Sequence, residues 1–175
     1  MLKPLPMLMV LSLSGCVMMS HADRPSGWPA PVDNGALCDL LPGLYRNTGV
    51  SSQAGAQPTS TSRLFGKATE ATHVRLRMHD QRTLSFVAEQ EGRPVAERRV
   101  DVDCSKAFVP FGPERAERLV NEGGAFGYTR DSYRLQPARN GDVTVRSANF
   151  TTGIMLLIPV AGSESDWALF TREQE

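Results

Sequence analysis

The residues that could do chemistry in this chain are few, and the cysteines are the first to consider. They are Cys16, Cys38 and Cys104. A thiol can pair with another thiol, bind a metal, attack a substrate or carry a lipid, and its surroundings decide among these roles. Cys16 follows a leader-like segment, whereas the other two cysteines lie in the main part of the chain, so the three need not share one role.

Residues 1–15 have the three-part layout of a signal peptide. A positive charge at Lys3 precedes an apolar stretch from Leu5 to Leu13, and two small residues follow it. The apolar stretch is too short to cross a bilayer as a helix, because that takes about 20 residues. We therefore predict that the chain is exported and that the leader is removed.

The end of the leader, from Leu13 to Cys16, resembles the lipobox of bacterial lipoproteins: Leu, a small residue, Gly or Ala, then Cys. The resemblance implies a diacylglycerol on the Cys16 thiol and an acyl group on its new amino terminus, which together hold a protein on a membrane effectively permanently. A plain secretory signal with an unmodified cysteine is the alternative. In Gram-negative lipoproteins an Asp after this cysteine usually favours the inner membrane. Here Val17 follows, so the resemblance implies the outer membrane.

The remaining cysteines, Cys38 and Cys104, form an even pair in a compartment that permits disulfides. We predict a bridge between them, with two free buried thiols as the alternative. Closing a loop of that size stabilises a fold by about 4 kcal/mol on the chain-entropy model.

Residues 16–36 are rich in Pro, Gly, Ser and Asp and show no helical or strand period. We predict a lipid anchor followed by a flexible tether, which would span about 25 Å as a random coil. Within it, Met18, Met19 and His21 have side chains that suit copper. Methionines beside a lipid anchor also suit the membrane interface, which is the interpretation we prefer.

Candidate catalytic groups are limited to His73, His79, Asp101 and Asp103. The two histidines would stand about 20 Å apart along a strand, too far to share a metal. The aspartates would stand about 7 Å apart, a separation that could serve glycoside cleavage, although strand alternation produces such pairs without any function. Because the chain has no serine-hydrolase elbow, phosphate-binding loop or His-Glu-x-x-His motif, we predict no catalytic residues, no metal and no cofactor.

The composition describes one ordinary globular domain. Hydrophobic residues make up 41% of the chain and charged residues 22%, and 19 basic residues balance 19 acidic ones. The basic residues are scattered and no aromatic run accompanies them, which argues against a nucleic-acid partner. We assign residues 37–175 to a single β-rich domain.

Alternating apolar residues predict two hairpins. Residues 73–79 and 83–89 alternate with a period of two, and a three-residue loop places Met78 opposite Leu84 and Val74 opposite Ala88. The same register places His73 beside Glu89 on the outer face. A second hairpin turns at residues 91–93 into a strand that brings Cys104 toward the core.

The second half of the chain adds a helix and more strands. Residues 113–121 have the proline start, the apolar side and the glycine stop of a short helix. Strands at 132–137 and 143–150 flank an Asn-Gly turn, with an odd number of residues in the loop. The segment from Ile154 to Ile158 is apolar at every position, so we expect a strand that is central or covered on its outer side.

These elements predict a mainly β fold: an antiparallel meander forming a curved sheet or a small closed barrel, with one short helix. Between residues 38 and 49 the chain has Cys, Leu, Gly, Tyr, Asn and Gly in that order, followed by Cys104 and Trp167. Over residues 37–172 this pattern resembles small lipoproteins of proteobacteria, a resemblance that implies no activity. The Gly43-Leu44-Tyr45 segment also resembles, distantly, the Gly-x-Trp start of lipocalins.

Two classes of function follow from the sequence. We expect a non-enzymatic lipoprotein that faces the periplasm from the outer membrane and binds a protein partner or an apolar ligand, or plays a structural role. The competing class is a small hydrolase acting on envelope polymers or lipids.

Overall fold

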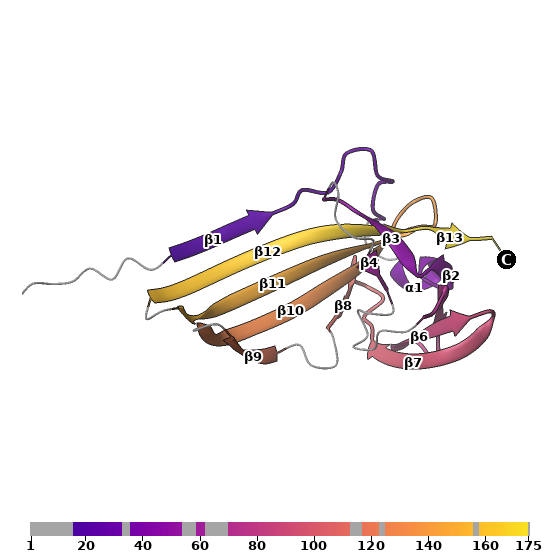
Figure 1. Cartoon of the computed structure of the whole chain (residues 1–175). Helices are drawn as coiled ribbons and strands as arrows, with labels where there is room; N and C mark the ends of the chain where they lie inside the picture. The colour runs from indigo at the N-terminus through magenta and orange to yellow at the C-terminus, as the bar shows by residue number, and fades with distance from the viewer. Residues whose placement is uncertain are drawn as a thin grey trace, which may run out of the picture.

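The computed structural model describes residues 16–32, 36–53, 59–61, 70–112, 117–122, 125–155 and 158–174, with one short helix and thirteen strands (Figure 1). The predicted leader, residues 1–15, lies outside the described residues, and of Cys16 only the backbone is described. In the first half of the chain the elements are β1 (Cys16–His21), α1 (Leu37–Leu40), β2 (Gly43–Arg46), β3 (Thr48–Ser51), β4 (Thr59–Ser60), β5 (His73–Met78) and β6 (Thr83–Gln90). In the second half they are β7 (Arg93–Asp101), β8 (Val109–Phe111), β9 (Glu117–Glu122), β10 (Ala125–Pro137), β11 (Val143–Met155), β12 (Ile158–Phe170) and β13 (Arg172–Glu173).

The described strands form two sheets. The larger has eight strands in the order β4-β3-β12-β11-β10-β8, with β1 added along β12 and β9 along β10. The smaller has five strands in the order β13-β2-β5-β6-β7. This confirms the mainly β prediction in its curved-sheet form, because the described strands do not close into a barrel.

The hairpin registers predicted from alternation are confirmed. Met78 lies opposite Leu84 and Val74 opposite Ala88, as a three-residue loop requires. The next turn is tighter than predicted: Glu91 and Gly92 both have positive φ, 51° and 74°. That conformation matches the twist of the flanking strands in a two-residue hairpin, and glycine adopts it without strain.

The two sheets pack face to face at one end of the molecule, which we call the body. The apolar core there combines residues of the smaller sheet with residues from the last third of the chain. Its members with no more than 2% exposure include Leu37, Leu41, Tyr45, Val74, Leu84, Phe86, Val109, Leu135, Val143, Val145 and Phe170. The space between the sheets is therefore filled with side chains.

The predicted disulfide is present in the structure, joining Cys38 in α1 to Cys104 beyond the end of β7. The two Cα atoms are 5.3 Å apart, an ordinary separation for a bridge. Because Leu37 and Leu41 beside Cys38 are buried, the bridge and the core together hold α1 against the body.

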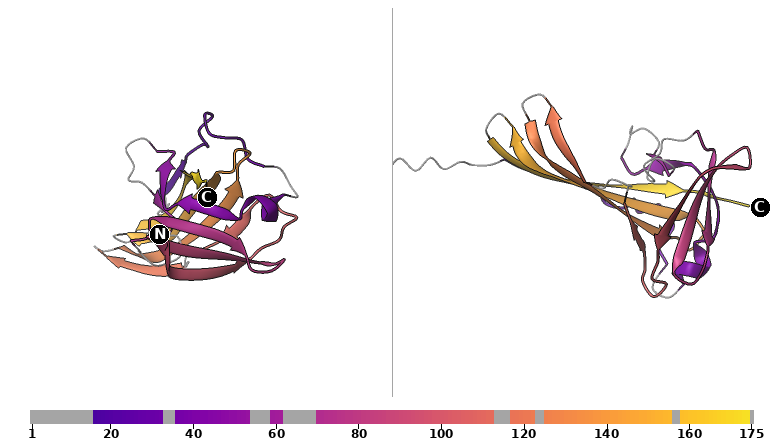
Figure 2. Two further views of the ribbon diagram at one scale, coloured as in Figure 1. Left: turned by 90° about the vertical axis from the view of Figure 1, so that its right-hand side faces the viewer. Right: turned by 90° about the horizontal axis from the view of Figure 1, so that it is seen from below.

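Beyond the body, three long strands continue together as a projecting arm (Figures 1 and 2). We define the arm as β1, β9 and the mutually paired segments 125–131, 149–155 and 158–164 of the three long strands. Each long strand has 13 residues, and the ladders between them show no register shift. Alternation of side chains is thus unbroken from the core to the end of the arm.

The predicted helix at residues 113–121 is wrong. Residues 117–121 belong to β9, which pairs antiparallel with β10, while residues 113–116 lie outside the described residues. The apolar positions that suggested one helical side also fit a strand, and the partner strand decides between them because β10 offers a free edge there. The one described helix is α1.

The predicted tether, residues 16–36, differs from the structure at its beginning. Cys16–His21 form β1, which runs parallel to β12 and pairs residue by residue with positions 160–165. Further on, Pro31 bridges to Ala138. Backbone hydrogen bonds to the edge of β12 supply the order that the composition does not indicate, and residues 33–35 lie outside the described residues.

We expected the apolar segment 154–158 to form a strand that is central or covered on its outer side. Of its described residues, Ile154 and Met155 are central, because β11 pairs there with both β10 and β12, but they are not covered. Ile154 and Met155 end β11, and Ile158 begins β12, all at the far end of the arm. They are 50%, 49% and 47% exposed. The expectation assumed that the chain itself would cover them, but the core lies at the other end of these strands.

Candidate functional site

The far end of the arm brings together the lipobox cysteine and exposed apolar side chains. Cys16, the first residue of β1, pairs with Val160, two positions from the start of β12. Ile154, Met155 and Ile158 lie at the same end, across the β11–β12 ladder. The site predicted for lipid therefore lies farthest from the body, at the end of the arm (Figure 1).

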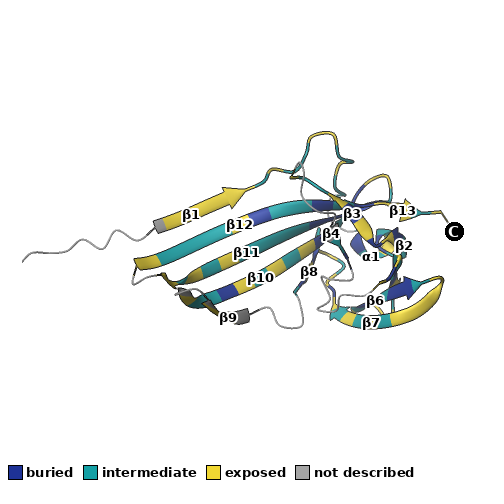
Figure 3. Cartoon of the chain, viewed as in Figure 1, coloured by how far each residue is buried: buried dark blue, intermediate teal, exposed yellow. Residues whose placement is uncertain are grey.

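The strand registers sort the arm's side chains onto two faces. Residues directly opposite in a ladder share a face, so Phe126, Ile154 and Pro159 lie together, and Arg130 and Phe150 follow on the same face. We call this the apolar face. Its large hydrophobic members are exposed: Val17 65%, Met19 73%, Leu119 74%, Phe126 60%, Phe150 47% and Ile154 50%. Figure 3 shows buried parts of the long strands in the body giving way to a mixture of intermediate and exposed residues along the arm.

The opposite face of the arm is mostly polar. Thr129 and Thr151 are joined by a hydrogen bond of 3.1 Å between their hydroxyls, and Thr151 donates to the amide oxygen of Asn149 at 3.1 Å. The Asn149 amide in turn donates to Asp131 at 2.6 Å. The side chains of Thr129, Thr151, Asn149 and Asp131 therefore satisfy one another on this polar face.

Charge divides between the two faces in the same way. On the described parts of β10, β11 and β12 the basic residues are Arg130, Arg134 and Arg146, and the registers place all three on the apolar face. The acidic residues are Asp131, Glu164 and Asp166, and all three lie on the polar face. Between Arg130, the outermost of these arginines, and the end of the arm, the described parts of β10, β11 and β12 carry no charged residue.

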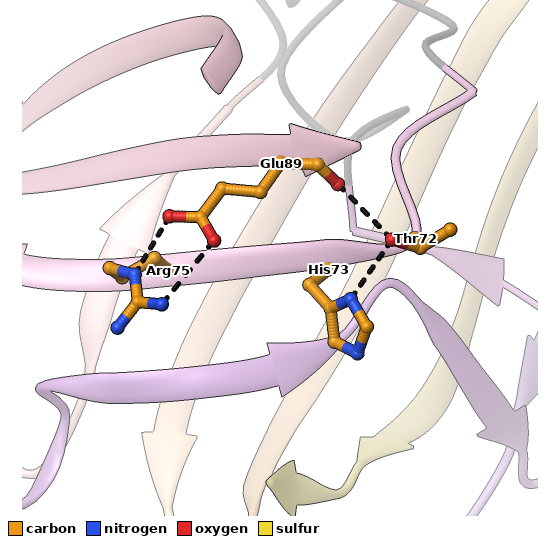
Figure 4. A network of polar contacts seen from close by, with 4 residues as sticks. All are labelled: Thr72, His73, Arg75 and Glu89. Carbon is orange, nitrogen blue, oxygen red and sulfur yellow. Dashed lines mark hydrogen bonds and ion pairs between the residues drawn. The ribbon is translucent and has the colours of Figure 1, made fainter. Parts of the chain in front are cut away.

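The strand residues His73 and Glu89 were expected side by side on a solvated outer face. They are opposite each other, but Glu89 is only 7% exposed. Its carboxylate accepts hydrogen bonds from Nε of Arg75 at 2.7 Å and from Nη2 at 3.4 Å (Figure 4). Nδ1 of His73 lies 2.9 Å from the Thr72 hydroxyl. The ion pair and the histidine contact therefore lie on two interior strands of the smaller sheet, where they satisfy polar groups of the protein itself.

The other candidate catalytic groups lie apart on the surface. His79 follows the end of β5, at the opposite end of that strand from His73. Asp101 ends β7 and is exposed, as is Asp103. Asp103 accepts hydrogen bonds from the amide and hydroxyl of Ser105, and these lower the pKa of its carboxyl. A carboxylate stabilised in this way is a poor proton donor.

A cleft with a volume of about 650 Å³ lies on the body. Arg75, Arg77 and Arg172 line it together with Asp142 and Glu173. Of these, Arg75 already pairs with Glu89, while the Arg172 side chain donates to the Pro42 carbonyl at 2.7 Å. The cleft is therefore polar, and it lies on the body rather than on the arm.

The described residues contain neither a helix suited to a membrane nor a cluster of side chains suited to a metal ion. No described helix has the length and apolarity needed to cross a membrane. No group of three or more His, Cys, Asp or Glu side chains in the described part of the chain is placed to hold a metal ion.

Sequence reasoning missed the two-faced arm, although part of the signal is present. Residues 126, 128 and 130 alternate with glycine, threonine and aspartate, as do 150, 152 and 154 with threonine and glycine. The small residues weakened the pattern, so the strands were predicted to begin at residue 132 and to end at residue 150.

Comparison with known proteins gives no match. No protein-family model matches the sequence, and no curated protein or solved structure matches the chain. The resemblance to small lipoproteins of proteobacteria stays a prediction.

Proposed function

We propose that this chain is a lipoprotein of the bacterial envelope, anchored by lipid on Cys16 in the outer membrane, and that it acts by binding a protein partner. The observation that carries the proposal is the place of Cys16. A lipid there would attach at the end of the arm and leave the body free to make contacts. A lipid on a residue packed against the body would instead cover part of its surface.

The arm changes how such an anchor would work. A flexible tether would let the body lie at any height over the membrane up to its full reach. A paired strand sets a length instead: from position 158 to 166, β12 spans about 26 Å at the usual rise per residue. The body would stand about that far from the lipid in an upright arm, and nearer in a tilted one.

The filled core favours a protein partner over an apolar ligand. Ligand sites are commonly cavities of about 300–1,000 Å³ with predominantly apolar walls. In the body that space is occupied by core side chains such as Phe86 and Leu135, and the cleft of about 650 Å³ on the body is lined by charged residues. Contacts made by the surface of the body are therefore the binding mode that we propose.

Lipidation is tested by expressing the full chain in a Gram-negative host supplied with an alkyne-labelled fatty acid. The expected result is a labelled protein in the outer-membrane fraction, whose amino-terminal peptide has the mass of a lipid-modified Cys16. Cys16→Ser should abolish the label, and Cys38→Ser, which removes another cysteine, should keep it. An amino-terminal peptide with an unmodified thiol would refute the anchor.

The binding role needs a separate measurement. Crosslinking of intact membranes followed by mass spectrometry should recover one reproducible neighbour joined to residues of the body. Failure to recover any neighbour, with the lipid confirmed, would refute partner binding and leave the anchor intact.

A further inference from the structure

We infer that the apolar face of the arm docks on the surface of a bilayer with anionic headgroups, its outer end buried among the lipids and its arginines at the headgroups. The inference rests on the proposed membrane location. It adds a second contact between protein and membrane, made by side chains and independent of the lipid on Cys16.

The first support is the order of side chains along the apolar face. Starting from the far end, the rows contain Phe126 with Ile154 and Asn121, then Tyr128 with Thr152 and Leu119, then Arg130 with Phe150 and Glu117. Arg134 and Arg146 follow as an opposed pair. Along β10 itself, the order Phe126, Tyr128 and Arg130 matches the environments from acyl chains through the interface to phosphate groups.

The second support is that the far end of the arm is apolar on both sides. Met155 and Ile158 lie on the opposite face and are 49% and 47% exposed, and Met18 of β1 lies on the same face, 76% exposed. Ile154 and Phe126 lie on the apolar face at the same rows. A partner protein or a second copy laid on one face would leave the other side exposed, whereas lipid surrounds both.

The third support is charge. The three basic residues of the long strands share the apolar face and their three acidic residues share the other. Each basic residue near an anionic membrane surface contributes about 1 kcal/mol of attraction. On the apolar face, the described parts of β10, β11 and β12 thus carry three arginines and no acidic residue, and β9 adds one acidic position, Glu117, so the basic residues are in excess there.

The open edges of the arm set the depth. In the described residues no strand pairs with the outer edge of β1 or of β9. Unpaired backbone groups cost several kcal/mol each in the hydrocarbon region, so the arm cannot cross the bilayer. It can enter the interface, about 5–10 Å deep, where water still reaches the strand edges.

The test places a tryptophan on the apolar face and measures its contact with lipid. Full-length protein carrying Phe126→Trp is purified from membranes and reconstituted in vesicles of phosphatidylethanolamine and phosphatidylglycerol, with or without bromine-labelled acyl chains. Val95→Trp is the matched control, because Val95 is a similarly exposed apolar residue, 48% exposed, on β7 of the body. The emission of the native Trp28 and Trp167 is subtracted by using the wild-type chain.

We expect brominated lipid to remove about half of the added emission for Phe126→Trp, as for a group at interfacial depth, and almost none for Val95→Trp. Adding Arg130→Glu and Arg134→Glu should reduce the quenching to the level of the control. Adding Arg77→Glu and Arg82→Glu instead, which makes the same change of charge on exposed residues of the body, should leave it unchanged.

Equal quenching at positions 126 and 95 in a protein whose Cys16 peptide is lipidated overturns the inference and leaves the anchor in place. A blue-shifted but unquenched signal at 126, with crosslinks to a second copy or another protein, overturns it in favour of a protein cover. Should Cys16 prove unmodified, the same quenching is measured after the protein is added to preformed vesicles. Contact at position 126 then supports the inference without the lipid, and no contact overturns it.

Discussion

Where β10, β11 and β12 cross the body, one of their faces packs against β2, β5 and β6; where the same strands form the arm, no other described sheet covers either face. The body buries Leu135, Val145 and Ala168 of these strands in its core. In the arm, the buried residue of the paired segments is the polar Thr129. The arm is therefore stabilised by its ladders and side-chain pairs, whereas the body is stabilised chiefly by apolar burial.

The body therefore contains the apolar side chains that stabilise the fold, whereas the arm contains exposed apolar side chains that are available for contacts. A sheet of three or more strands needs an apolar face that is covered to be stable on its own. The apolar face of the arm is not covered by another described sheet. The arm is therefore held in place by the body, because the three long strands are continuous from one to the other. Substitutions should consequently act on global stability in the body and only locally in the arm.

The largest effect is expected from the disulfide. Replacing Cys38 and Cys104 together by serine should lower the free energy of unfolding by about 4 kcal/mol, because the bridge closes a loop of 66 residues. Urea denaturation of the variant against the oxidised wild type measures this. A loss below about 1 kcal/mol would mean that the packing of α1 constrains the chain without the bridge.

A matched pair of leucines compares the two regions directly. Leu84→Ala should cost about 3 kcal/mol, because Leu84 is fully buried in the body. Leu119→Ala in the arm, at a residue that is 74% exposed, should cost no more than about 0.5 kcal/mol. Urea midpoints of the two variants supply the comparison, and similar losses would contradict the division into body and arm.

The buried Tyr45 gives the body a pH dependence. Its hydroxyl donates to the Leu41 carbonyl at 3.0 Å, and burial raises the pKa of Tyr45 to about 12. Because the folded state disfavours the phenolate, stability should be full below about pH 10 and fall by about 2–3 kcal/mol as the pH rises to about 12.

Unfolding measured between pH 9 and 12 checks this. Tyr45→Phe should lose most of the dependence on pH, although it forfeits the hydrogen bond and starts from a lower stability. An unchanged alkaline slope in that variant would assign the titration to other groups.

The smallest global effect is expected at Gly127 in the arm. A Cβ there would lie 2.5 Å from the backbone oxygen of Thr152 and 3.0 Å from Cα of Gly153. Gly127→Ala should therefore cost about 1–2 kcal/mol, confined to the arm. Gly27→Ala is the control, since nothing lies within 4 Å of its Cβ.

Amide hydrogen exchange can resolve the two regions. In Gly127→Ala the backbone amides of 125–131 and 149–155 should exchange faster, while those of β5 and β6 keep their protection. Faster exchange throughout would show that arm and body unfold as one unit.

How far the sequence predicted this molecule depends on where each segment is buried. The register of β5 with β6 followed from alternation because one face of that hairpin is in the core. The bridge between Cys38 and Cys104 followed from the number of cysteines. In the arm the same reasoning failed in part: residues 113–121 were predicted as helix although 117–121 form β9, and the strand at 154–158, predicted to be central or covered, has no cover over Ile154 and Met155. The patterns assumed a protein core that those residues never reach.

The candidate site was only partly predictable for the same reason. Cys16 was found from a local motif, which needs no tertiary information. Its position at the end of the arm depends on the pairing of β1 with β12, which no pattern in residues 16–21 indicates. The separation of arginines from acidic residues depends on two registers at once, and it becomes visible only when the three long strands are aligned.

The parallel pairing of β1 with β12 also determines how the molecule would carry load. A pull on Cys16 directed away from the body acts along the strand axis, so the six paired positions of β1 are sheared together. In a tether the pull would only straighten the coil. Tension on the membrane attachment would thus pass through that ladder into β12 and on to Phe170 in the core. The first strand would therefore transmit force from the membrane to the body.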